Sequence, residues 1–159
     1  MSALDGWTLN PQFIDLSRYS SFVKVCRITA NVERFIENCG RRNEKMEMKI
    51  GPMEVQEIKE TKLMWIKSAQ REATPADICN LSDGKPVGLK SLLKTLTPFL
   101  DENNILRVRG SIDHAAVCYY VKHPMIITHT HQLCRLVIMD CLFPCGTSSS
   151  VTSCVTHAQ

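Results

Sequence analysis

Residues 20–38, with the sequence SSFVKVCRITANVERFIEN, are the stretch that decides the fold. Apolar side chains recur there every three or four residues, which is the period of an α-helix with one broad apolar face. Ser20 and Ser21 are suited to cap the helix, and Gly40 follows where helices commonly end. The apolar positions are Phe22, Val25, Cys26, Ile28, Val32, Phe35 and Ile36.

A second helix is predicted from Pro52, which suits a first helical turn, to about Glu72. Its apolar stripe includes Trp65, which we expect in the core. Acidic residues come early in this segment and basic residues late, in agreement with the helix dipole. The charged segment 41–49 connects the two helices, and we expect it to be solvated rather than to bind phosphate. Residues 1–72 therefore predict a helical connector region built as an αα-hairpin.

The chain changes character after this hairpin. Residues 73–88 contain two prolines and two glycines and predict a linker. Residues 94–100 and 105–109, separated by the turn sequence DENN, predict an antiparallel β-hairpin in which Pro98 marks an edge strand. Residues 123–128 predict a third strand, and residues 129–141 return to helical spacing. The fold class predicted is α+β, with a small β/α region over 89–141.

The last part of the chain, residues 142–159, predicts a disordered tail. It contains no Asp, Glu, Lys or Arg, and its apolar residues follow no regular period.

The composition excludes several classes of protein. The chain has 159 residues with 44% hydrophobic and 22% charged residues, which is typical of a globular domain. A net charge of +3 permits contact with nucleic acid without demanding it. No apolar run is long enough to span a bilayer, and the first residues do not resemble a signal peptide. We therefore expect an intracellular protein, cytoplasmic or nuclear, whose eight cysteines are reduced.

One cluster of residues has metal-ligand character. It spans 123–145, and its strongest candidates are His129, His131, Cys134 and Cys141. Structural zinc takes four such ligands, often with a CxxC pair, and the chain has no CxxC. Partly exposed histidines and buried thiols explain the same residues. We therefore expect no cofactor, with a small zinc-binding protein as an alternative.

Catalytic patterns are weaker. Asp101 and Glu102 are explained by turn chemistry, and the serines at 148–150 lack a setting that would activate a nucleophile. No phosphate-binding glycine motif is present. The residues predict a protein that is not an enzyme, has no small-molecule substrate and has no catalytic residues.

Five pieces of sequence between residues 14 and 141 stand in a characteristic order. They are Ile14–Phe22 continuing to Ile36, Trp65-Ile66-Lys67 with Gln70, Pro98–Glu102 with Leu106-Arg107-Val108, Lys122–Ile127, and Leu136–Cys141. In this order they resemble the Pol polyprotein of BEL/Pao-type retrotransposons, from the connector after reverse transcriptase and RNase H into the N-terminal extension of the integrase. The resemblance implies a truncated, non-catalytic fragment that ancestrally supported integrase binding to DNA ends during DNA integration.

The chain departs from the family pattern at several places. The turn glycine of the family is Asn104 here, which still tolerates a positive φ. The zinc-binding His-His pair and the later CxxC do not appear, and the resemblance stops near Cys141. We interpret the tail as a frame change or a spliced end. The carboxylates of the integrase catalytic core are not present.

Two alternatives remain besides the inert fragment and the zinc protein. A host could retain the fragment as a nucleic-acid-binding module or as a protein-binding module. A basic stripe on the hairpin would favour nucleic acid, and its members would be Lys90, Lys94, Arg107 and Arg109. The expected partners are DNA or other Pol and integrase subunits, with no membrane.

Overall fold

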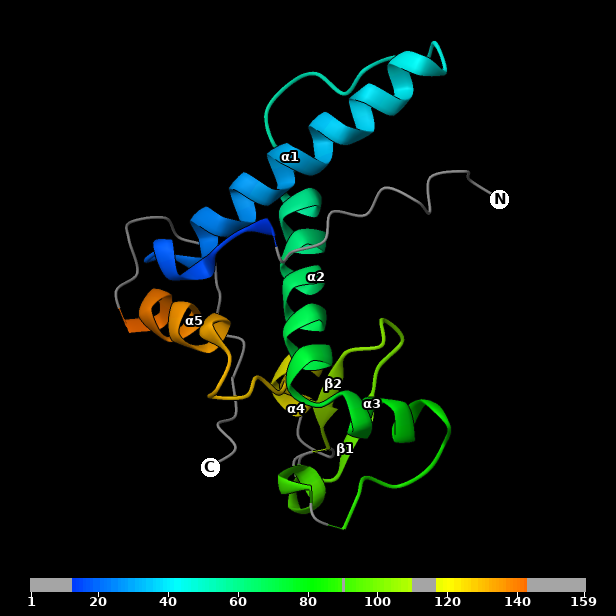
Figure 1. Ribbon diagram of the computed structural model, residues 1–159, viewed down its shortest axis with the longest axis vertical. Helices are drawn as coiled ribbons and strands as arrows, with labels where there is room; N and C mark the ends of the chain where they lie inside the picture. The colour runs from blue at the N-terminus through cyan, green and yellow to red at the C-terminus, as the bar shows by residue number, and fades with distance from the viewer. Residues whose placement is uncertain (1–12, 90, 110–116, 143–159) are drawn as a thin grey trace.

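The computed structural model describes residues 13–89, 91–109 and 117–142. Within these ranges the protein is an α+β fold with five α-helices and a two-stranded antiparallel sheet, as the sequence predicts (Figure 1). The α-helices are α1 Phe22–Asn43, α2 Val55–Ala73, α3 Pro75–Ser82, α4 Tyr119–Lys122 and α5 Gln132–Leu142. Two 3₁₀ helices are η2 Leu16–Arg18 and η3 Leu92–Leu96, and the strands are β1 Pro98–Leu100 and β2 Leu106–Val108.

The predicted helical hairpin is confirmed in α1 and α2. The hydroxyl of Ser21 caps α1, and the two helices run antiparallel with α1 crossing α2 obliquely (Figure 1). The indole Nε1 of Trp65 donates to the hydroxyl of Thr29 at 3.0 Å. Trp65 is only 3% exposed, so it is a core residue as expected. This hydrogen bond between α1 and α2 therefore helps to fix how the two helices pack against each other.

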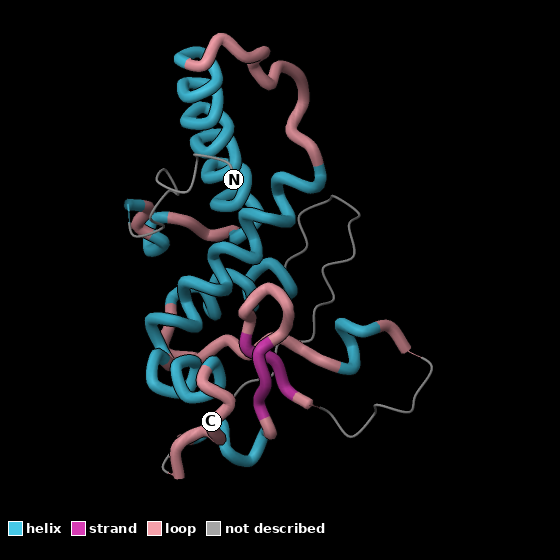
Figure 2. The backbone as a smooth tube through the Cα atoms, turned by 90° about the vertical axis from the view of Figure 1, so that its right-hand side faces the viewer, coloured by secondary structure: helices cyan, strands magenta, loops and turns pink. Residues whose placement is uncertain are grey.

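The helix α1 has two different halves. All of its buried residues lie between Phe22 and Ala30. The remainder of α1 and the return segment to α2, residues 31–54, contain no buried residue and project away from the rest of the molecule (Figures 1 and 2). We call residues 31–54 the arm and the packed remainder the base. The helix passes through Gly40, further than predicted, and Arg41 pairs with Glu37 one turn earlier.

The sheet is a short hairpin at the lower end of α2. Pro98 pairs with Val108 and Leu100 with Leu106, so β1 is the edge strand that the proline predicts. The turn uses Asn104 at φ 55°, as expected for the residue that replaces glycine. The first strand is shorter than predicted because residues 92–96 form a 3₁₀ helix.

The predicted third strand, 123–128, is reduced to one bridge between Met125 and Arg107. The amide of Ile126 donates to Leu106 at 3.1 Å, and the amide of Val108 donates to Pro124 at 3.0 Å. The buried side chain of Gln70 completes this edge. It accepts from the Leu106 amide at 2.8 Å and donates to the carbonyls of Leu106 and Ile126 at 2.9 and 2.7 Å. One helix side chain thus bonds to both extended segments.

The linker predicted at 73–88 requires a correction, because it contains the helix α3. Pro75 is in the first turn of α3, where the missing N–H of proline is harmless. The hydroxyl of Ser91 bonds to Asp77 at 2.7 Å, and Leu81 packs against a buried cluster with Leu106 and Ile126. The main core draws residues from both 1–72 and 89–141. At the other end, Leu142 still belongs to α5, and the predicted tail over 143–159 lies outside the described residues.

Candidate functional site

One member of the predicted basic stripe, Arg107, is buried, so that part of the prediction is wrong. It is only 2% exposed, and its Nε lies 2.6 Å from a carboxylate oxygen of Asp101. Its Nη1 donates to the carbonyl of His123 at 2.8 Å. All three residues of β2 are buried, because α2 covers one face of the strand and residues 124–126 adjoin its edge. Arg107 is therefore a structural residue and cannot contact phosphate.

The same guanidinium supports a group of aromatic side chains. Its central carbon lies 5.4 Å from the ring centres of both Tyr119 and Tyr120, which is close enough for cation–π contact. The ring of Tyr119 is 4.8 Å from the imidazole of His123, and Phe99 meets that imidazole edge-on at 5.2 Å. A buried cation thus orders aromatic rings that stand nearer the surface.

The rings of Phe99, Tyr119 and His123 line an open hollow of about 550 Å³ beside the hairpin, which we call the aromatic hollow. The exposed guanidinium of Arg109 lies 5.5 Å from the centre of the Phe99 ring. Tyr119 is 47% exposed, so its ring can be reached from solvent. The lining residues are Phe99, Arg109, Val117, Tyr119, Lys122 and His123. Two cations and three aromatic rings therefore converge on one depression.

The other members of the predicted stripe have different outcomes. Arg109 lines the aromatic hollow. Lys94 is exposed on η3 but does not line the hollow. Lys90 lies outside the described residues. The four residues therefore do not form one stripe, and the cations that line the aromatic hollow are Arg109 and Lys122.

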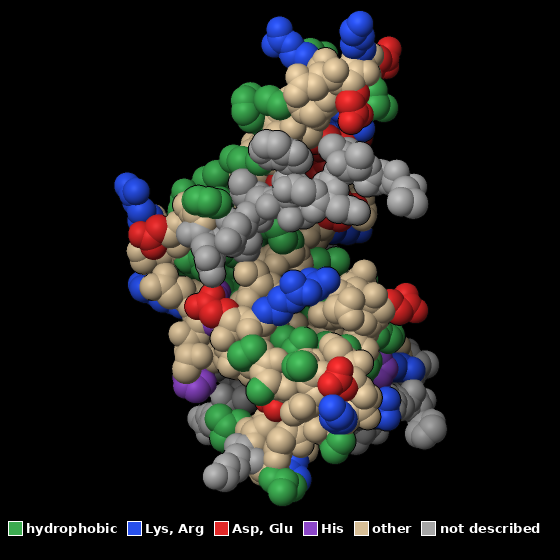
Figure 3. Space-filling view, turned by 45° about the vertical axis from the view of Figure 1, so that its right-hand side comes forward, with side chains coloured by type: hydrophobic (Ala, Val, Ile, Leu, Met, Phe, Trp, Pro, Cys, Tyr) green, Lys and Arg blue, Asp and Glu red, His purple; other side chains and the backbone are tan. Residues whose placement is uncertain are grey.

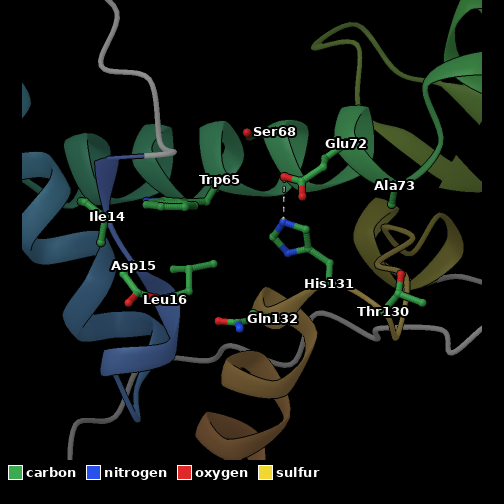
Figure 4. A pocket seen from close by; sticks show the side chains of 10 residues that line it. All are labelled: Ile14, Asp15, Leu16, Trp65, Ser68, Glu72, Ala73, Thr130, His131 and Gln132. Carbon is green, nitrogen blue, oxygen red and sulfur yellow. Dashed lines mark ion pairs between the residues drawn. The ribbon is translucent and has the colours of Figure 1, made fainter.

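A second hollow, of about 540 Å³, lies between α2, the start of α5 and the segment before α1. Figure 4 shows Trp65 and Leu16 on one side of it and His131 and Gln132 on the other. Its charged lining residues are the carboxylates of Asp15 and Glu72, beside the imidazole of His131. A hollow lined by carboxylates does not favour an anionic ligand.

The imidazole of His131 is held by both nitrogens. Its Nδ1 accepts from the amide of Leu133 at 3.1 Å, which caps the start of α5. Its Nε2 faces Glu72 across 3.5 Å (Figure 4). His131 therefore connects α5 to α2, and neither nitrogen is presented to a metal.

The other candidate zinc ligands do not gather around His131. Cys134 is buried in the main core and Cys141 is exposed on the same helix. His129 precedes α5 in an exposed turn. Among the residues that the structure describes, no three His, Cys, Asp or Glu side chains are grouped as a metal site requires.

The buried thiols are poor nucleophiles. Burial raises the pKa of Cys26 to about 12, against the opposing effect of nearby Lys62. Burial also raises the pKa of Cys134. The thiolate is the reactive form, so neither cysteine is activated.

Comparison of the chain with protein-family models, with curated proteins and with solved structures found no match. In the described part of the chain, no helix is both long enough and apolar enough to cross a membrane.

The sequence predictions missed most of the aromatic hollow. Phe99 and Lys122 enter the sequence predictions only through the predicted strand and the family resemblance, and Tyr119 does not enter them at all. The available signal is the sequence YYVKH at 119–123, in which two tyrosines, a lysine and a histidine occur within five residues. Aromatic and basic residues that lie close together are typical of surfaces that stack bases and hold phosphates.

Proposed function

We propose that the chain is a non-catalytic fragment of a BEL/Pao-type Pol polyprotein that contacts single-stranded nucleic acid through the aromatic hollow. The observation that carries this proposal is the convergence of Arg109 and Lys122 with Phe99 and Tyr119 around one open depression. Aromatic rings bind the faces of bases, while cations bind the phosphates between them. This chemistry fits the ancestral role that the resemblance implies, which is to support integrase at DNA ends.

The arrangement favours unpaired bases over a duplex. A hollow lined by rings accepts a flat base that has left its stack, whereas the phosphates of a duplex are met by cations on a convex surface. Frayed or processed DNA ends supply such bases. A host-retained nucleic-acid-binding module would use the same residues, and the binding experiment applies to both origins.

The direct test is fluorescence anisotropy of a 5′-labelled single-stranded oligonucleotide titrated with the full chain. We expect Tyr119→Ala to weaken binding by about 1–3 kcal/mol, or roughly 5- to 150-fold, because one stacking ring is lost. Arg109→Ala should reduce the slope of log affinity against log salt concentration by about 0.7, as expected for one phosphate contact on a single strand.

The matched control is Arg135→Ala, which removes an exposed arginine from α5, away from the hollow. This variant should bind as the parent chain does. Binding that is absent at low salt, or that falls equally in Arg135→Ala and Arg109→Ala, would contradict the proposal. A second assay incubates oligonucleotide ends with the chain in Mg²⁺ or Mn²⁺, and we expect neither trimmed nor joined products.

A further inference from the structure

The outer face of α1 carries an apolar stripe that the base does not cover. Phe35 is 68% exposed and Ile28 is 40% exposed. Cys39 is also exposed, and Val32 between them is half-buried. These four residues are spaced by four, three and four positions, so they form one line along the helix. They lie on a different face from the residues that pack against α2 and α5.

The return segment adds further apolar side chains to the arm. Met46, Met48 and Ile50 are each more than half exposed. The side chain of Asn38 accepts from the amide of Lys49 at 2.8 Å and donates to its carbonyl at 3.1 Å. Asn38 is three positions after Phe35 on the helix, so the return segment is held next to the stripe. In Figure 3, hydrophobic side chains lie on the surface of this projecting part, below basic side chains at its tip.

The charges around the stripe are of one sign. Lys24 and Arg42 are exposed about 50° from its line and Arg27 about 110° from it, all three on the same side, and none has an ion-pair partner among the described residues. The acidic residues inside α1 are on its other side and are already bonded. Glu33 accepts from Thr61, and Glu37 pairs with Arg41 and Lys49.

We propose that this outer face, from Ile28 to Cys39, binds an acidic amphipathic helix of a protein partner. Apolar residues of the partner would cover the stripe, and its flanking carboxylates would meet Lys24, Arg27 and Arg42. The stripe extends roughly 16 Å, so a partner helix of about three turns covers it. The methionines of the return segment suit such a site because their flexible side chains adapt to a packed neighbour.

A second copy of the chain fits this face less well. In an antiparallel pair of α1 helices, Lys24 and Arg27 of one copy would meet Arg42 of the other. This arrangement places like charges together, which is unfavourable at a close interface. The charges therefore favour a partner of opposite sign.

The experiment uses the full chain and two labelled amphipathic peptides of about 14 residues. Both peptides have the same leucine stripe, with glutamates beside it in one and lysines in the other. Anisotropy should show binding of the glutamate peptide and at least tenfold weaker binding of the lysine peptide. Phe35→Glu should weaken binding of the glutamate peptide at least tenfold. The control Leu92→Glu alters a side chain on η3 that is also 68% exposed, and it should leave binding unchanged.

Charge reversal keeps the proposal testable if Phe35→Glu fails to fold. The double variant with Arg27→Glu and Arg42→Glu should no longer bind the glutamate peptide and should bind the lysine peptide instead. Arg109→Ala should keep full peptide binding, which separates this site from the aromatic hollow. Equal binding of both peptides, displacement of the peptide by an oligonucleotide, or concentration-dependent dimerisation in sedimentation that Phe35→Glu abolishes would overturn the proposal.

Discussion

The base and the arm have the same kind of sequence but different packing. In the base, Val25 and Cys26 of α1 are fully buried and contact a core shared with α2 and α5. In the arm, Phe35 lies on a different face of the same helix and is 68% exposed. Apolar period therefore predicts a helix in both places but does not predict which stripe finds a partner within the chain. Three measurements can break or sharpen this comparison.

The largest expected effect comes from Trp65→Ala in the base. The indole is buried and donates to the Thr29 hydroxyl, so its removal leaves a cavity and takes away one hydrogen bond of that hydroxyl, which still donates to the carbonyl of Val25. We expect a loss of about 3–5 kcal/mol in the free energy of unfolding, measured in urea. The arm counterpart, Phe35→Ala, should change that free energy by less than about 0.5 kcal/mol. Similar losses in both variants would show that the arm is packed as the base is.

Gln70→Leu should have the next largest effect. The substitution keeps most of the side-chain volume but removes bonds to the amide of Leu106 and the carbonyl of Ile126. Each buried backbone group left without a partner costs about 1–3 kcal/mol, so we expect a loss of about 2–4 kcal/mol in urea. Gln56→Leu on the same helix is the control, because Gln56 is exposed and bonds only to Glu60. A loss no greater than that of the control would mean that Gln70 does not hold the sheet.

The smallest effect concerns the joint between arm and base. Arg34 on α1 pairs with Glu57 on α2, and its Nε lies 2.9 Å from a carboxylate oxygen. The guanidinium, together with the Glu54 amide, holds the pKa of Glu57 below its usual value, despite some opposing burial. A lowered folded pKa stabilises the fold above the ordinary carboxyl pKa, and this stabilisation is lost as the pH falls through the folded value.

The joint is measured by comparing the parent chain with Glu57→Gln in urea from pH 7 to pH 3. At pH 7 the parent should have the larger free energy of unfolding. The difference should be smaller than the loss expected for Gln70→Leu. The difference should shrink as the pH falls through the lowered pKa of Glu57 and the carboxylate becomes protonated. Subtraction removes the opposite effect of Glu33, whose pKa is raised by burial. A difference that does not change with pH would show that the pair contributes nothing to stability.

Local patterns predicted the elements of this fold well. The period of residues 20–38 gave α1, and the DENN turn gave the hairpin with Asn104 at positive φ. The prolines were harder to interpret, because Pro75 marks the start of α3 rather than a linker. Proline is common both in linkers and in the first turn of a helix, and only the packing of the residues that follow it distinguishes these two cases.

The candidate site was less predictable for a physical reason. Arg107 and Arg109 are two residues apart, which predicts one face of a strand, yet one is buried and the other exposed. The difference arises from Asp101 and the carbonyl of His123, which satisfy Arg107 from across the turn and from beyond the hairpin. No local period contains that information. The YYVKH sequence was visible, but its position beside Phe99 depends on the tertiary fold.

The side chain of Gln70 has a consequence for the order of folding. Its bonds join residues 36 and 56 positions apart, so they close two long loops at once. Closing such loops costs chain entropy before any stabilising contact forms. The hydrogen bonds of Gln70 therefore form slowly and late in folding. Until α2 has formed, the hairpin 98–108 and the segment 124–126 therefore lack the hydrogen bonds from Gln70 that hold them together. When a ribosome has released α2 but not residue 126, the side-chain amide of Gln70 still lacks the carbonyl of Ile126, so the β region becomes native only after both segments have emerged.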